Sequence, residues 1–103
     1  MAVIVTFSVA GYDVATYKRN SASLGTTALL KQQPGFIMQA VYKTSEGLGA
    51  VEIWHSREQF EEWDSGFRPQ VDEKLDADSL QMTHEITDLV RLVIPENVQP
   101  ITT

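Results

Sequence analysis

The chain contains no cysteine among its 103 residues. Disulfide bridges, a thiol nucleophile, cysteine-ligated metal sites and thiol redox chemistry are therefore excluded. Basic residues are also few, since eight Lys and Arg stand against fourteen Asp and Glu, for a formal net charge of -6. No cluster of Lys and Arg offsets this charge locally, so we expect no nucleic acid partner.

Long apolar runs are absent as well. No stretch approaches the roughly 18 apolar residues that a bilayer-spanning helix needs, so we expect no membrane partner. The opening residues lack the basic region and cleavage site of a secretion signal, which predicts a cytoplasmic protein. The acidic residues do not have the spacing of a calcium-binding loop, and the sequence predicts no metal site.

What is present is the composition of an ordinary globular domain, with 43% hydrophobic and 21% charged residues. We expect a single domain over residues 1–94. Residues 95–103 carry two prolines and no periodicity, and we interpret them as a C-terminal tail that could cross onto a partner subunit.

Hydrophobic spacing predicts the order strand, helix, strand, strand, helix, strand. The strands are expected over residues 2–9, 36–43, 50–55 and 80–94, and the helices over 14–32 and from 57 to about 75. Weak helix formers around Gly25 predict a break in the first helix. Ser56 to Gln59 form a capping box that starts the second helix, and Pro69 is expected to interrupt it.

This order is the split βαβ arrangement, which predicts a ferredoxin-like α+β fold with both helices on one face of a four-stranded antiparallel sheet. The strands carry apolar residues on both faces, as Ile4 and Val5 illustrate in the first strand. A monomer would expose the face without helices, so we expect a homodimer that pairs through the sheet face.

One segment resembles the third strand and second helix of the antibiotic-biosynthesis monooxygenase type of dimeric α/β barrel. It reads Val51-Glu52-Ile53-Trp54-His55-Ser56-Arg57-Glu58-Gln59-Phe60-Glu61-Glu62-Trp63. Pro34-Gly35-Phe36 fits the same resemblance. The family implies a ferredoxin-like protomer whose sheets pair into a barrel, with a ligand cavity between helices and sheet. Its superfamily includes cofactor-independent monooxygenases, haem-degrading monooxygenases, isomerases, cyclases and proteins without assigned activity, so the fold leaves function open.

The resemblance also tests the haem-degrading alternative. Trp63 falls at the position of the tryptophan that ruffles haem in those members, but their axial histidine has no counterpart here. The corresponding region holds Asp72 or Glu73, and the asparagine expected on the first strand is replaced by Thr6, Phe7 or Ser8. Without an imidazole to ligate iron, we expect no haem and no other cofactor.

A cofactor-independent monooxygenase needs a base or hydrogen-bond donor that stabilises a substrate phenolate in a dry pocket. His84 and His55 are the only imidazoles and are the candidate catalytic residues. Each could equally be a strand residue that hydrogen-bonds at the margin of the sheet.

Six residues are candidates for binding the substrate: Trp63, Tyr42, Tyr17, Trp54, Asn20 and Glu52. The aromatic residues offer flat walls and polar donors, although core packing explains them too. Asn20 lies near the expected break at Gly25, where a pocket could open, or on a solvated helix face. Glu52 and Glu85 are mid-strand carboxylates that could be functional, or could pair across the dimer with Lys43, Arg57 or Arg91.

The sequence therefore predicts a dimeric α/β-barrel protein that binds a small aromatic or polyketide-like molecule, with cofactor-independent oxygenation as its activity. The alternative from a different class is a non-catalytic dimeric module whose cavity is packed shut, because no matched nucleophile and base pair is visible.

Overall fold

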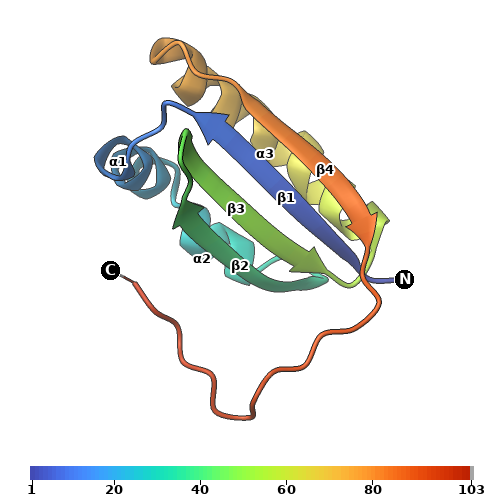
Figure 1. Ribbon diagram of the computed structural model, residues 1–103. Helices are drawn as coiled ribbons and strands as arrows, with labels where there is room; N and C mark the ends of the chain where they lie inside the picture. Colours follow the sequence, from blue (N-terminus) through green and yellow to red (C-terminus); the bar gives the residue numbers. More distant parts are fainter. Residues whose placement is uncertain (103) are drawn as a thin grey trace.

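The computed structural model describes residues 1–102, which fold into one antiparallel sheet with a layer of helices on one face (Figure 1). The elements are β1 (Val3–Ala10), α1 (Val14–Leu24), α2 (Thr26–Lys31), β2 (Phe36–Lys43), β3 (Gly47–Trp54), α3 (Arg57–Ala77) and β4 (Met82–Asp88). The strand order is β2-β3-β1-β4, with β3 and β1 in the centre. The predicted ferredoxin-like α+β fold is confirmed.

The break in the first helical segment is also confirmed. Gly25 adopts a left-handed conformation with φ of 67°, which ends α1 and lets α2 start in a new direction. A residue with a Cβ is disfavoured in that conformation, so glycine suits this position. In Figure 1, α2 lies behind β2, and α1 lies to the left of the adjacent ends of β2 and β3.

The hairpin between β2 and β3 is tighter than predicted, and β3 begins at Gly47 instead of Ala50. The Thr44 hydroxyl accepts the N–H groups of Glu46 and Gly47 at 3.3 and 2.9 Å, which closes the turn within three residues. At the other end, Phe36 pairs with Trp54 but Met38 pairs with Ile53, so a β-bulge lies between Phe36 and Met38.

The predicted interruption of the second helix at Pro69 is wrong, because α3 runs unbroken through this residue. Proline costs a helix interior about 3 kcal/mol through its missing N–H and its steric clash. That cost is offset here by packing on both sides of Pro69, since Phe67 and Leu75 are buried. At the start of α3 the Ser56 hydroxyl caps the N–H of Gln59 at 3.1 Å, as the capping box predicts, and the Gln59 side chain accepts from that hydroxyl.

The last strand is shorter than predicted and ends at Asp88 instead of Ile94. Its partner β1 begins at Val3, and the final hydrogen bond joins Leu89 N–H to the carbonyl of Ala2. Beyond that point no neighbouring strand remains to pair with, so the apolar sequence alone cannot extend the sheet. Figure 1 shows the following segment running away from the sheet.

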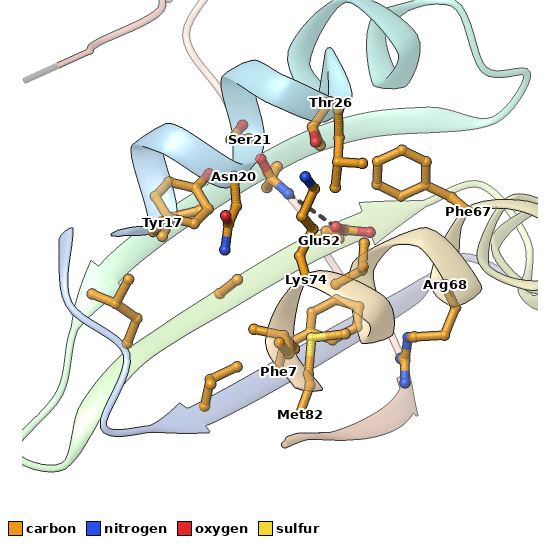
Figure 2. A pocket seen from close by; sticks show the side chains of 18 of the residues that line it. Phe7, Tyr17, Asn20, Ser21, Thr26, Glu52, Phe67, Arg68, Lys74 and Met82 are labelled. Atoms are coloured by element: carbon orange, nitrogen blue, oxygen red, sulfur yellow. Dashed lines mark hydrogen bonds between the residues drawn. The ribbon is translucent and has the colours of Figure 1, made fainter. Parts of the chain in front are cut away.

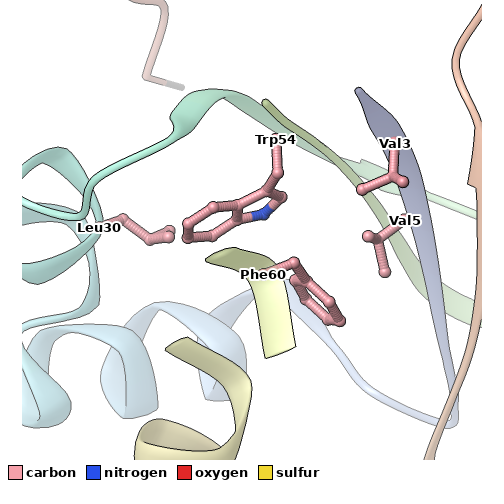
Figure 3. Close-up of a cluster of buried hydrophobic side chains, with 5 residues drawn as sticks. All are labelled: Val3, Val5, Leu30, Trp54 and Phe60. Carbon is pink, nitrogen blue, oxygen red and sulfur yellow. The ribbon is translucent and has the colours of Figure 1, made fainter. Parts of the chain in front are cut away.

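The core lies between the sheet and α3, around the fully buried indole of Trp54 (Figure 3). Val3 and Val5 of β1, Leu30 of α2 and Phe60 of α3 converge on it. Trp54 and Phe60 meet edge to face with ring centroids 5.9 Å apart. This cluster fixes α3 against β1 and β3, and with it the floor and one wall of a cavity.

The opposite face of the sheet carries no helix. Register places Ile4 and Met38 on either side of Ile53 there, and Tyr42 covers Gly49. Five apolar residues after β4 are largely exposed as well: Val90, Val93, Ile94, Val98 and Ile101. None of the helices in residues 1–102 is long and apolar enough to cross a membrane.

Candidate functional site

A cavity of about 130 Å³ lies between the helices and the sheet and is partly open to solvent (Figure 2). Its floor is built by alternate residues of the central strands, among them Phe7 of β1 and Leu48 of β3. Trp63 and Phe67 form the wall on α3, with parallel rings whose centroids are 4.5 Å apart. The helix places them on one face because they are four residues apart.

Glu52 supplies the carboxylate of this otherwise apolar floor. It is 5% exposed, and it is the one charged residue found buried within residues 1–102. The indole N–H of Trp54 donates to Oε1 at 3.0 Å, and the Gln39 amide donates to Oε2 at 3.0 Å. Neither donor is charged, so the carboxylate is held in place without being neutralised.

The electrostatics of Glu52 follow from this setting. Burial raises its pKa above the usual glutamate value, because a charged carboxylate is poorly solvated there. The hydrogen bonds from Trp54 and Gln39 oppose this rise, as does the charge of Arg68, whereas Asp64 adds to it. Desolvation is the largest of these effects, and the carboxylate is thus a stronger base than an exposed glutamate.

Arg68 of α3 lines the cavity but is engaged elsewhere. Its Nε lies 3.3 Å from Asp64 Oδ1, an ion pair whose geometry does not make a hydrogen bond, so this buried N–H lacks an acceptor. Its Nη2 lies 3.2 Å from Nδ1 of His84, and the guanidinium sits over the ring of Phe7. Most of the positive charge is therefore directed to Asp64 and His84.

The α1 side of the cavity carries polar groups on an aromatic frame. The Asn20 amide donates to the Tyr12 hydroxyl at 3.0 Å, and the rings of Tyr12 and Tyr17 meet edge to face at 6.0 Å. Burial raises the pKa of both tyrosines, which keeps their hydroxyls protonated. The cavity thus offers neutral donors opposite Glu52.

Four of the predicted binding residues meet at this cavity: Tyr17, Asn20, Glu52 and Trp63. The other two lie outside its lining. Trp54 is in the core beneath it, and Tyr42 points from the other face of the sheet, where it is 46% exposed. Within the protomer Glu52 is held by Trp54 and Gln39, and Arg57 pairs with Glu61; an ion pair of Glu52 with Lys43, Arg57 or Arg91 across the dimer stays a prediction.

Neither candidate catalytic histidine lines the cavity. His55 is exposed just after β3, and its backbone N–H bonds to the carbonyl of Gly35. His84 lies on the edge strand β4, where it stacks on Phe7 at 5.7 Å and contacts Arg68. Both of these neighbours line the cavity, whereas His84 does not.

Several lining residues were not predicted from the sequence, chiefly Gln39, Arg68 and Lys74. Gln39 could have been found from the hairpin, because it is the register partner of Glu52. Arg68 directly precedes the expected interruption at Pro69, and Lys74 lies beyond it. Lys74 faces the cavity because α3 continues through Pro69.

The arrangement can hold a flat ring against Trp63 and Phe67 and present a base to a polar substituent on that ring. Within residues 1–102 no three His, Asp or Glu side chains lie close enough to hold a metal ion. Proton transfer and hydrogen bonding are the chemistry that the described side chains can supply by themselves.

Comparison with known proteins gives matches among solved structures only. No protein-family profile matches the sequence, and no curated protein sequence matches it. SnoaB, a cofactor-independent oxygenase from Streptomyces nogalater, superposes with a TM-score of 0.62 at 20% identity, over 92% of this chain and 96% of that one.

A Deinococcus radiodurans protein proposed to be an antibiotic biosynthesis monooxygenase superposes with a TM-score of 0.65 at 10% identity, over 94% and 100% of the two chains. The chain has the fold of the antibiotic-biosynthesis monooxygenases. The ActVA-Orf6 monooxygenase of Streptomyces coelicolor, solved in complex with Nanaomycin D, matches with a TM-score of 0.57 at 17% identity, over 92% of both chains. At these identities the likeness establishes the fold alone.

Proposed function

We propose that this protein is a cofactor-independent monooxygenase that binds a small aromatic or polyketide-like molecule in the cavity between helices and sheet. The observation that carries the proposal is a carboxylate, Glu52, buried in an aromatic-walled cavity that is open at one side. SnoaB, which shares the fold, is a cofactor-independent oxygenase, and ActVA-Orf6 is a monooxygenase with an organic ligand bound.

The size of the cavity limits what enters it. A volume of about 130 Å³ is close to the ~150 Å³ of an engineered apolar cavity that binds benzene. It is below the range of roughly 300 Å³ and more that is typical of sites for drug-sized ligands. One ring therefore fits inside, and further fused rings extend through the open part of the cavity.

The proposed reaction uses only the substrate and dioxygen. Removal of a proton from a hydroxyl of the ring gives an anion that is delocalised onto a ring carbon. That carbon gives electrons to dioxygen, one oxygen atom becomes a quinone carbonyl, and the other leaves as water. For a ring CH2 group this balances as CH2 plus O2 giving C=O plus H2O, with no external reductant. The protein contributes the base and a water-poor site.

The proposed active form is a homodimer that pairs through the sheet face without helices. Ile4, Met38 and Ile53 form an apolar strip across three strands of that face. The exposed apolar residues after β4 provide a second surface that a partner subunit would cover.

A non-catalytic binding module is the second candidate, and one observation favours it. Both histidines lie outside the cavity lining, so no imidazole is available there as an acid or base. The two candidates share the ligand and differ only in whether dioxygen is consumed.

Oxygen uptake with a panel of anthrols, whose keto tautomers carry the ring CH2 group, separates them. We expect the wild type to consume dioxygen and form a quinone above the background rate. His84→Ala is expected to reduce the rate through the loss of the contact with Arg68, and His55→Ala is the matched control that leaves it unchanged. Background rates in all three proteins would rule out the oxygenase and leave the binding module.

A further inference from the structure

Glu52 is a buried carboxylate with unused hydrogen-bonding capacity. Each of its oxygens accepts one hydrogen bond, from Trp54 and from Gln39, and a carboxylate oxygen has room for two. Among the ion pairs within residues 1–102, none includes Glu52. The side chain is fixed by two neutral donors, and Glu52 lines the cavity.

The charge of Arg68 favours the ionised form of this carboxylate, but no charged group lining the cavity forms an ion pair with it. Tyr17 from α1 faces it with a protonated hydroxyl, and Asp64 from α3 is itself negative. Arg68 directs its guanidinium to Asp64 and His84, and Lys74 contributes a cation from the next turns of α3 (Figure 2). Burying a carboxylate without a direct cationic partner is costly, so the site favours a ligand that brings a proton to it.

We propose that Glu52 is the proton acceptor for a hydroxyl group on the aromatic ring bound in this cavity. This assignment rests on the proposed function, and it replaces the two histidines as the catalytic base. In the step, the O–H bond of the ring hydroxyl breaks and its electron pair stays on the substrate oxygen. The proton forms a new bond to a Glu52 carboxylate oxygen.

The geometry explains why the acceptor is this residue. Glu52 lies on the cavity floor in the central strand β3, whereas Trp63 and Phe67 form the wall on α3, so a ring lying against that wall directs its substituents to the floor. Trp54 and Gln39 hold both carboxylate oxygens, which removes the need to reorganise during proton transfer. The substrate class that fits is a neutral hydroxyarene, because an aromatic carboxylate would be repelled by Glu52.

The test compares p-cresol with its methyl ether, in which a methyl group replaces the hydroxyl proton. Binding of each is followed by NMR titration of the wild type between pH 4 and pH 8. We expect the wild type to prefer p-cresol by roughly tenfold at pH 8, the effect of one hydrogen bond to a charged group. The preference should fall as the pH is lowered through the pKa of Glu52.

Three variants complete the experiment. Glu52→Gln should show a preference that does not change with pH, because its amide oxygen accepts a hydrogen bond but does not titrate, whereas Glu52→Asp should keep a weaker preference with the same pH dependence as the wild type. Glu62→Gln is the matched control, because Glu62 is exposed on α3, and it should behave as the wild type. A preference that is constant with pH in the wild type, or one that still falls at low pH in Glu52→Gln, would overturn the assignment.

Oxygen uptake measured alongside keeps the two proposals apart. A preference that depends on Glu52, without any dioxygen consumption, would support the proton acceptor and defeat the oxygenase. Dioxygen consumption that is unchanged in Glu52→Gln would defeat the proton acceptor and leave the oxygenase standing. If the wild type binds neither compound, both proposals fail.

Discussion

Replacing Trp54 by phenylalanine tests the link between the core and the cavity. Trp54 is fully buried, and its indole N–H is one of the two donors to Glu52. Losing a hydrogen bond to a charged group costs about 1.5–3 kcal/mol. A residual void of roughly 40 Å³, at ~24 cal/mol per Å³, adds about 1 kcal/mol. We therefore expect Trp54→Phe to lower the free energy of unfolding at pH 8 by about 2.5–4 kcal/mol.

The pH dependence of this cost separates its two parts. At low pH Glu52 is protonated and the lost bond is one between neutral groups, so the cost should fall to about 2 kcal/mol. The measurement is urea denaturation of wild type and variant at pH 8 and pH 4. At ~4–8 °C per kcal/mol, the expected fall in Tm at pH 8 is about 10–30 °C.

The matched control is Trp63→Phe. Trp63 also lines the cavity and stacks on Phe67, but no hydrogen bond joins it to Glu52. Its cost should not depend on pH. Equal costs at pH 8 and pH 4 for Trp54→Phe would refute the reasoning, because they would show that the indole does not hold an ionised carboxylate.

Three further predictions concern stability. Glu52→Gln should stabilise the fold at pH 8. Folding raises the pKa of Glu52, so the wild type is relatively most stable below the unfolded pKa and loses stability as the pH rises through the folded pKa. The difference in Tm between variant and wild type should therefore vanish near pH 4, and a difference that is constant with pH would count against this prediction. Phe60→Ala should cost about 3–5 kcal/mol in urea denaturation, because the ring packs on Trp54 in the core, and a cost under 1 kcal/mol would contradict that packing. Gly35→Ala should lower the free energy of unfolding more than Gly25→Ala. Both positions have a positive φ, which costs a residue with a Cβ about 1–2 kcal/mol, but only at Gly35 would the new Cβ overlap the Gln59 side chain. Equal costs would show that this side chain moves aside freely.

The order of elements was predictable because each element repeats its own period. Alternating apolar residues mark the strands, and the aromatic residues of α3 recur every three or four positions. The break at Gly25 followed from local propensity, which packing did not overrule. At Pro69 packing overruled the low helix propensity of proline. The end of β4 was set by the position where its partner β1 begins. Long-range contacts decide such positions, and a single sequence does not display them.

Part of the cavity lining was predictable from the same periodic patterns. Tyr17 and Trp63 lie on apolar helix faces, which must turn toward the sheet, and Glu52 stood out as a carboxylate inside a strand. The side of the sheet that each β2 residue faces was not predictable, because the bulge after Phe36 shifts the alternation and leaves Tyr42 on the open face. Lys74 could not be placed while α3 was expected to be interrupted at Pro69.

The most direct test of the whole account is where a hydroxyarene binds. Backbone amide shifts can be mapped by NMR during titration with naphthol. We predict that the largest changes lie at Tyr17, Asn20, Glu52 and Phe67, which surround the cavity. Shifts confined to Ile4, Met38 and Tyr42 on the open face of the sheet, or the absence of any shift, would contradict the account.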